Sequence, residues 1–113
     1  MIQMVSAVIK PHRLDEVKNA LRAAGVTGLT VTEVRGFGRQ GGKTETYRGS
    51  EYIVDLLPKV KVEVVLDGGD TDKVVEIITA AANTGTIGDG KVWVTAVDQI
   101  VRIRTGEVGL DAI

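Results

Sequence analysis

The chain has 113 residues, of which 43% are hydrophobic, so we expect a single domain, residues 1–113, with one hydrophobic core. A formal net charge of -1 and an aromatic content of 4% argue against a nucleic-acid-binding protein, which would carry a basic patch and stacking platforms. The absence of cysteine excludes disulfides, thiolate catalysis and zinc–thiolate sites.

The first residues, Met-Ile-Gln-Met-Val, lack the basic and then apolar pattern of a secretory signal. No apolar run reaches the roughly 20 residues that span a bilayer. We therefore expect a cytoplasmic protein that meets a membrane only through a partner.

Hydrophobic periodicity separates strands from helices along the chain. Residues 2–9 are apolar on both alternating faces, which is typical of a strand covered on both sides. In 71–83, Val74, Ile77, Ile78 and Ala81 follow the spacing of one helix face. The expected order is a strand at 2–9, a helix at 13–24, strands at 29–37 and 60–66, a helix at 71–83, a strand at 91–97 and an extended tail at 100–104.

This order predicts the ferredoxin-like βαββαβ arrangement, an α+β fold in which one antiparallel sheet carries both helices on one face. Taken alone, Trp93 on its strand is most simply a core residue. The second face of the sheet would be bare of helices, however, and Val65, Trp93 and Val97 add apolar side chains to it. Because large exposed apolar patches mark interaction sites, we expect a homo-oligomer.

A long polar segment, 38–58, joins the second and third predicted strands. Connections in compact domains usually take about 4–6 residues, and longer ones are often functional. Two tyrosines, Tyr47 and Tyr52, bracket a charged turn that a packed core would reject. We interpret the segment as a long loop that acts as an arm held by water or by a partner.

Two glycine-rich motifs resemble nucleotide fingerprints without meeting their conditions. Residues 36–41 spell GxGxxG after a strand, but a polar arm follows where a Rossmann motif needs an apolar helix. Residues 85–91 fit GxxxxGK, but Val92 replaces Ser/Thr, and the loop runs from helix to strand instead of strand to helix. This second loop is either a helix stop with a tight turn or an anion-binding nest in which Lys91 adds a charge.

Several cations could complete a polyanion site if the fold gathers them. Arg102 and Arg104 alternate along the expected tail, which would put both on one side, and guanidinium groups suit phosphate oxygens. Arg39, Lys59 and Lys91 are the other candidates. The single histidine, His12, has no partner at ligand or triad spacing, and we expect a surface or helix-start residue. Asp89 is most simply a turn residue, with a lysine or magnesium ion as the alternative partner.

The segments VTEVRGFGRQ (31–40), TETYRGSEY (44–52), TGTIGDGKVWV (84–94) and VRIRTGE (101–107) closely resemble the P-II nitrogen-regulatory signal-transduction proteins. The resemblance covers essentially the whole chain. It implies a homotrimer whose sheets face the threefold axis, with competing ATP and ADP sites in the clefts between subunits. Arg102 and Arg104 would reach the phosphates from a neighbouring subunit. The implied nucleotide-binding residues are Thr30, Gly38, Arg39, Gln40, Val65, Gly88, Asp89, Gly90, Lys91, Arg102, Ile103 and Arg104.

The resemblance further implies an effector, 2-oxoglutarate, and a regulatory output. Gln40 would coordinate the Mg²⁺ carried by ATP, that metal would chelate 2-oxoglutarate, and Lys59 would pair with the far carboxylate. Backbone amides near Gly41 and Gly42 would complete this effector site. Tyr52 matches the tyrosine that many members carry as a modification site, and Ser50 is the alternative. Ammonium transporters, nucleotidylyltransferases and metabolic enzymes are the implied partners, with no nucleic acid.

Four positions depart from the common pattern of the family. Gly41 and Lys43 replace the usual Lys and His, Thr86 stands where a basic residue is frequent, and Ser50 stands where many members have Ala. The favoured function is a sensor of ATP/ADP and 2-oxoglutarate that controls targets through its arm and is not an enzyme. A small nucleotide hydrolase or phosphotransferase is the alternative, although no general base is evident from the sequence. A ligand-free assembly module is a third.

Overall fold

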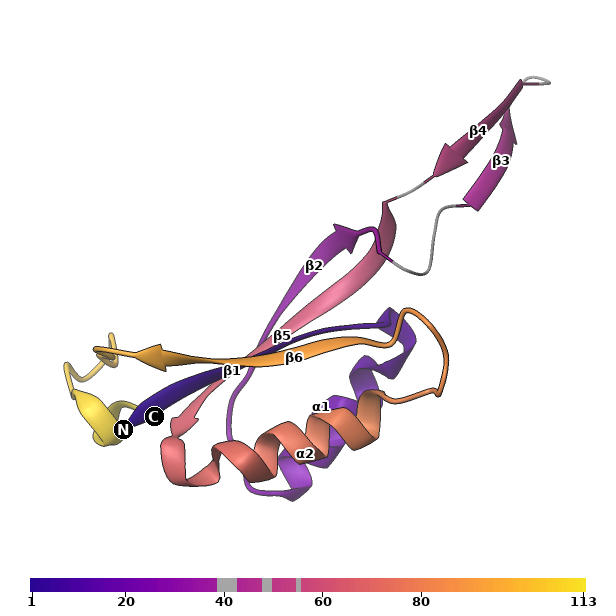
Figure 1. Ribbon diagram of the computed structural model, residues 1–113. Coiled ribbons are helices and arrows are strands. Elements are labelled where there is room, and N and C mark those ends of the chain that lie inside the picture. Colours follow the sequence, from indigo (N-terminus) through magenta and orange to yellow (C-terminus); the bar gives the residue numbers. More distant parts are fainter. Residues whose placement is uncertain (39–42, 48–49, 55) are drawn as a thin grey trace.

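The computed structural model describes residues 1–38, 43–47, 50–54 and 56–113. Its main sheet has four antiparallel strands in the order β2-β5-β1-β6, and both helices lie on one face of that sheet (Figure 1). This is consistent with the predicted α+β, ferredoxin-like arrangement. The elements are β1 (Ile2–Ile9), α1 (Leu14–Ala23), β2 (Thr30–Gly36), β3 (Lys43–Tyr47), β4 (Ser50–Val54), β5 (Leu57–Asp67), α2 (Thr71–Ala82) and β6 (Gly90–Val97).

The core lies between the helices and one face of the sheet. On β5, Val60, Val62, Val64 and Leu66 alternate with partly exposed residues, as the period of two predicts. Alternate residues of β1 point to the same side, and the buried stripes of α1 and α2 cover them. The largest fully buried side chains in this layer are Ile9, Leu21, Ile78, Val5, Val17, Val62 and Val64.

The main elements were predicted correctly to within a few residues, and β5 shows the largest difference. It begins at Leu57, three residues before the alternating pattern. Pro58 would be unfavourable inside a sheet because it has no backbone N–H to donate. Here it pairs with Arg35 of β2, whereas β1 first meets β5 at Val60. Pro58 therefore stands where β5 has only one neighbouring strand.

The predicted loop at 38–58 contains regular structure, which corrects the sequence-based expectation. β3 and β4 pair as an antiparallel hairpin that projects from the end of the main sheet (Figure 1). The backbone register joins Tyr47 to Ser50 and Glu45 to Tyr52. The arm is therefore a two-stranded ribbon, and Ser50 lies beside its turn.

The second face of the sheet is left without helices, as predicted. Trp93 lies on this face and is 42% exposed, so its interpretation as a core residue is wrong. It neighbours Ser6 of β1 across the strands, and Lys61 and Glu63 of β5 form a 3.7 Å ion pair on the same face. In the described part of the chain, no helix is long and apolar enough to cross a membrane.

We predict that a second copy of the chain covers this face. Light scattering at micromolar concentration should give a mass several times 12.0 kDa, and Trp93→Lys should lower that mass because it places a charge on the apolar face. Trp93 is the single tryptophan, so its emission should shift to longer wavelength as the assembly dissociates on dilution. Ala23→Lys, at an exposed position on α1, is the control and should leave the mass unchanged. A wild-type mass of one chain would contradict the prediction.

Candidate functional site

The loop between α2 and β6, residues 84–90, is closed by the carboxylate of Asp89. Its two oxygens accept hydrogen bonds from the Thr84 backbone N–H (2.7 Å), the Gly85 backbone N–H (3.0 Å) and the Thr84 hydroxyl. α2 ends at Ala82 and Asn83 is already extended (φ -71°, ψ 125°), so the helix stops before Gly85, whose positive φ of 77° turns the loop instead. The expectation that Asp89 is a turn residue is therefore confirmed.

Lys10, the residue after β1, reaches the same loop. Its ammonium lies 3.1 Å from Asp89 Oδ1 and donates to the hydroxyls of Thr84 (3.1 Å) and Thr86 (2.5 Å). The alternative partner considered for Asp89, a lysine, is thus present as well. Because the hydrogen bonds from Thr84, and to a lesser degree Lys10, favour the charged carboxylate, the pKa of Asp89 lies well below its ordinary value.

Lys59 contacts the loop from β5. Its ammonium donates to the backbone carbonyl of Gly88 at 2.7 Å. Burial, and secondarily repulsion from Lys10, lower the pKa of Lys59 below its usual value, while Asp89 opposes the shift. Two lysines, one directly after β1 and one on β5, therefore contact the same short loop.

A cleft of about 500 Å³ opens beside this loop. Lys59 and Lys91 line it together with two exposed apolar side chains, Phe37 (78% exposed) and Ile87 (60% exposed). The remaining lining residues come from the loop, from the start of the arm and from the open face of the sheet: Val8, Gly36, Gly38, Thr86, Gly88, Asp89, Gly90 and Trp93. The cleft is cationic, partly apolar and adjacent to the root of the arm.

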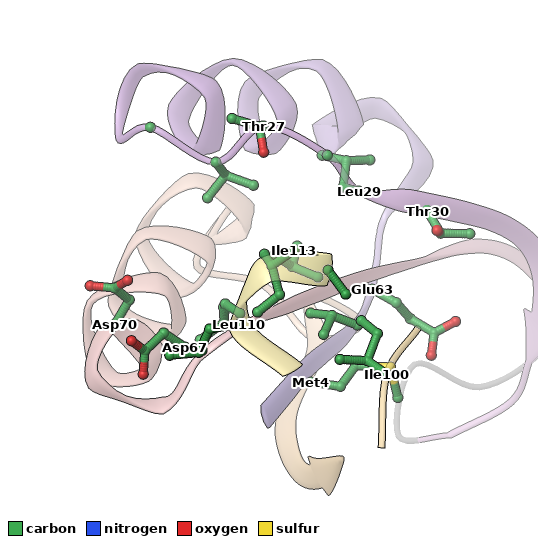
Figure 2. Close-up of a pocket in the computed structure, with 17 residues that line it drawn as sticks. Met4, Thr27, Leu29, Thr30, Glu63, Asp67, Asp70, Ile100, Leu110 and Ile113 are labelled. Atoms are coloured by element: carbon green, nitrogen blue, oxygen red, sulfur yellow. The ribbon is translucent and has the colours of Figure 1, made fainter. Parts of the chain in front are cut away.

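Thr30 and Val65 line a different cavity, of about 720 Å³. Figure 2 shows Leu29, which precedes β2, and Thr30, which begins it, on one side of this cavity, with Leu110 and Ile113 of the carboxyl-terminal segment on another and Glu63 below Thr30. Of the described residues, none lines both cavities. Val8, which lines the cleft, pairs with Lys91 of β6 on one side and with Lys61 of β5 on the other. On β5, Val65 lies four residues beyond Lys61, so the two cavities are separated by about 13 Å along the strands.

The segment after β6, residues 98–113, which contains Arg102 and Arg104, lies at the end of the sheet opposite the 84–90 loop (Figure 1). The extended tail predicted for 100–104 is wrong at its second half, because Val101 bridges to Val108 and residues 103–105 form the turn between them. Gly106 supports this turn with a φ of 73° and a hydrogen bond to the Arg102 carbonyl. Arg102 pairs with Glu107 at 3.1 Å and donates to the Ile113 carbonyl at 3.0 Å.

A single copy of the chain therefore gathers only part of the predicted nucleotide site. Gly38, Gly88, Asp89, Gly90 and Lys91 share the 500 Å³ cleft with Lys59, the predicted effector residue. Thr30 and Val65, and separately the turn that carries Arg102, Ile103 and Arg104, lie elsewhere. The predictions on Arg39, Gln40, Gly41 and Gly42 lie outside the described residues.

Sequence reasoning missed Lys10. No motif contains it, because its role arises from the pairing of Ile9 with Gly90, which sets the end of β1 beside the loop. His12, two residues later, is exposed within a short 3₁₀ helix, Pro11–Arg13, as predicted. Only the register of the sheet could have identified Lys10.

Known protein families contain close relatives of this chain. The model of the family "Nitrogen regulatory protein P-II" matches residues 2–107. The nitrogen regulatory protein P-II of Rhizobium meliloti is 60% identical over 112 residues, covering 99% of this chain and 100% of the relative. That of Azospirillum brasilense is 58% identical with the same coverage. Nitrogen regulatory protein P-II 2 of Methanothermobacter thermautotrophicus is 59% identical, covering 96% and 95%.

Gly90 should be the least replaceable residue of the loop. It has a φ of 100°, and a Cβ there would lie 1.7 Å from the Val8 carbonyl oxygen. We predict that Gly90→Ala lowers the free energy of unfolding by about 3 kcal/mol or more, because strain and a backbone clash add. Gly85→Ala shares the positive φ but meets no atom within 4 Å, so it should cost about 1 kcal/mol. Equal losses in urea denaturation would contradict this.

The titration of Asp89 can be followed by its carboxyl ¹³C shift. We predict a pKa below the ordinary value of 3.8, so that its contribution to stability is present above that pH and is lost as the pH falls towards the lower, folded-state pKa. Thr84→Val should raise the pKa of Asp89 most, since the hydrogen bond from the Thr84 side chain is the largest cause of its lowering, and Lys10→Met should raise it less. Thr79→Val is the control, because the Thr79 hydroxyl bonds the Val75 carbonyl within α2. An Asp89 pKa that is insensitive to Thr84 would be inconsistent with the geometry.

Proposed function

The chain belongs to the nitrogen regulatory protein P-II family, and from this premise we propose that it senses ATP, ADP and 2-oxoglutarate and passes the signal to target proteins through the β3–β4 arm. Membership makes it a nitrogen-regulatory signalling protein. The ligands and the mechanism are the proposal. The observation that carries it is the cationic cleft, where Lys59 and Lys91 meet the 84–90 loop at the root of the arm.

The cleft suits the phosphates of a nucleotide. Gly88 and Gly90 have φ values of 97° and 100°, which turn the backbone of the loop within one short segment. Such glycine-rich turns can direct several N–H groups at one anion, and Lys91 adds a full charge. The negative charge of Asp89 does not oppose phosphate binding, because its carboxylate accepts hydrogen bonds from Thr84 and Gly85 and pairs with the Lys10 ammonium.

A complete nucleotide site would need a second copy of the chain. Thr30 and Val65, proposed for the adenine, line the 720 Å³ cavity, which lies about 13 Å along the strands from the cationic cleft. The turn with Arg102, Ile103 and Arg104 lies at that far end as well. We therefore propose a homotrimer in which one subunit supplies the loop and its neighbour the arginines.

Magnesium would enter this site with ATP. Among the described residues no three metal-ligating side chains form a cluster, and the carboxylate of Asp89 is already bonded. The phosphate oxygens would then supply most ligands, in keeping with the preference of Mg²⁺ for few protein ligands. Gln40 is the proposed protein ligand, and when bound the metal would neutralise phosphate charge and chelate 2-oxoglutarate.

The proposed effector contact explains why the two ligands would be coupled. Lys59 would pair with the far carboxylate of 2-oxoglutarate, with Gly41 and Gly42 supplying amides. In the structure Lys59 donates to the carbonyl of Gly88 in the proposed phosphate loop. A carboxylate that draws Lys59 away would alter the loop, and such a differential contact is what coupling between two sites requires.

The output would be the arm, because its base adjoins the cleft at Gly36, Phe37 and Gly38. Modification of Tyr52, or of Ser50 beside the turn, would change the charge presented to a partner. The proposed targets are ammonium transporters, nucleotidylyltransferases or metabolic enzymes in the cytoplasm. An enzymatic role gains no support from Asp89, the carboxylate that lines the cleft, because its oxygens are engaged.

Calorimetric titration of 2-oxoglutarate in the presence of Mg²⁺ tests the proposal. We predict binding with saturating ATP and none with saturating ADP or without nucleotide, because the metal on ATP would provide the chelating centre. Lys59→Met should weaken this binding by about tenfold or more, the worth of one charge-assisted hydrogen bond. Lys73→Met removes the same charge from an exposed position on α2 and should change nothing.

Three results would count against the proposal. Absence of 2-oxoglutarate binding in all three states would overturn the sensor mechanism. Equal binding in all three would overturn the coupling. Steady-state ATP hydrolysis faster than about 1 per second, a low ordinary turnover, would favour the enzyme instead.

A further inference from the structure

Every donor of the Lys10 ammonium is used by one loop. The side chain is 15% exposed, and its Nζ contacts Thr84 Oγ1, Thr86 Oγ1 and Asp89 Oδ1. An ammonium has three hydrogens, so this set satisfies it. These contacts span 74 or more positions of the chain and join the end of β1 to both sides of the 84–90 loop.

The contact also removes a charge that would oppose an anionic ligand. Asp89 lines the same cleft as Lys59 and Lys91. The Lys10 ammonium lies 3.1 Å from Asp89 Oδ1, and Thr84 and Gly85 of the loop donate hydrogen bonds to the remaining acceptor positions of this carboxylate. Without Lys10, the carboxylate would present an uncompensated negative charge to whatever binds at Gly88 and Gly90.

Thr86 gives the contact a second component. Its hydroxyl is bonded both to Lys10 and, at 2.8 Å, to the hydroxyl of Thr84. The neighbouring Ile87 lines the cleft and is 60% exposed, so the backbone between Thr86 and Gly88 forms part of the cleft wall. Lys10 therefore fixes the loop on both sides of the segment that would face the ligand.

We propose that Lys10 is a positioning residue that holds the 84–90 loop in a phosphate-binding shape and neutralises Asp89, so that it favours ligands with more phosphate charge. This inference rests on the proposed nucleotide function. Lys10 need not touch the ligand, because it acts through Thr84, Thr86 and Asp89. Its removal should therefore weaken binding in proportion to the number of phosphates, which a general loss of structure would not do.

The affinities of ATP, ADP and AMP, each measured by calorimetry without effector, test the proposal. Lys10→Met should lower the affinity for ATP by about threefold to tenfold, the effect of one unit charge about 10 Å from a phosphate at a protein surface. The affinity for ADP should fall less, and that for AMP least. Lys10→Arg keeps the charge and the donors and should bind nearly as the wild type does. Lys18→Met, which removes a charge from α1, should bind all three ligands unchanged.

A double variant separates the two parts of the role. Asp89→Asn in the Lys10→Met background removes the uncompensated charge, so it should recover part of the lost ATP affinity. Thr86→Val removes one acceptor but no charge, and it should weaken ATP, ADP and AMP to a similar and smaller extent. If the double variant binds ATP no better than Lys10→Met, the neutralising role is wrong.

Hydrogen exchange of the ligand-free protein gives a readout that does not depend on nucleotide. Lys10→Met should speed exchange at the amides of Thr84 and Gly85 by roughly threefold to tenfold, in line with the loss of one charged contact, while core strands stay protected. A wild type that binds no nucleotide would overturn the proposed function, and the exchange result would then decide whether Lys10 holds the loop. Unchanged exchange in Lys10→Met would overturn the positioning role, and an equal loss of affinity for ATP, ADP and AMP would overturn the neutralising role.

Discussion

The pairing of β1 with both of its neighbours decides where each candidate binding residue lies. Ile9 stands opposite Val60 on one side and Gly90 on the other. This register brings Lys59, Lys10 and the 84–90 loop to the same end of the sheet. A slip by one residue would turn every side chain of a strand to the opposite face, so the alternation of buried valines on β5 and the cationic cleft depend on the same pairing.

Gly90 is where this register and the binding loop meet. The space beside its Cα is filled by the Val8 carbonyl, which a side chain would strike at 1.7 Å. Because β6 begins at that residue, the close approach of β1 also fixes the direction in which the loop leaves the sheet. Both the stability of the sheet and the geometry of the loop therefore require a residue without a side chain at position 90, and glycine also tolerates the φ of 100° found there.

Hydrophobic periodicity was sufficient to predict the helices and strands of the core, but it could not predict the contacts between the ends of strands and the loops. The stripe of Val74 and Ile78 predicted α2, because a helix that buries one face must repeat at its own period. The β3–β4 hairpin has a largely polar sequence that lacks such a pattern, so it resembled a loop. The alternation of Arg102 and Arg104 is typical of an extended segment and predicted no turn at 103–105, whereas Gly106, with its positive φ, follows that turn.

The distribution of the proposed site over two ends of the protomer has a consequence for signalling. The 84–90 loop and Lys91 lie at one end of β6, and Arg102 lies beyond the other end. The eight residues of the strand span roughly 24 Å, so these groups cannot converge on one triphosphate within a protomer. A nucleotide that used both would bridge two copies, and its affinity would depend on how those copies sit against each other. By linkage, any partner that favours one arrangement of the subunits would then change nucleotide affinity by the same factor that the nucleotide changes partner affinity.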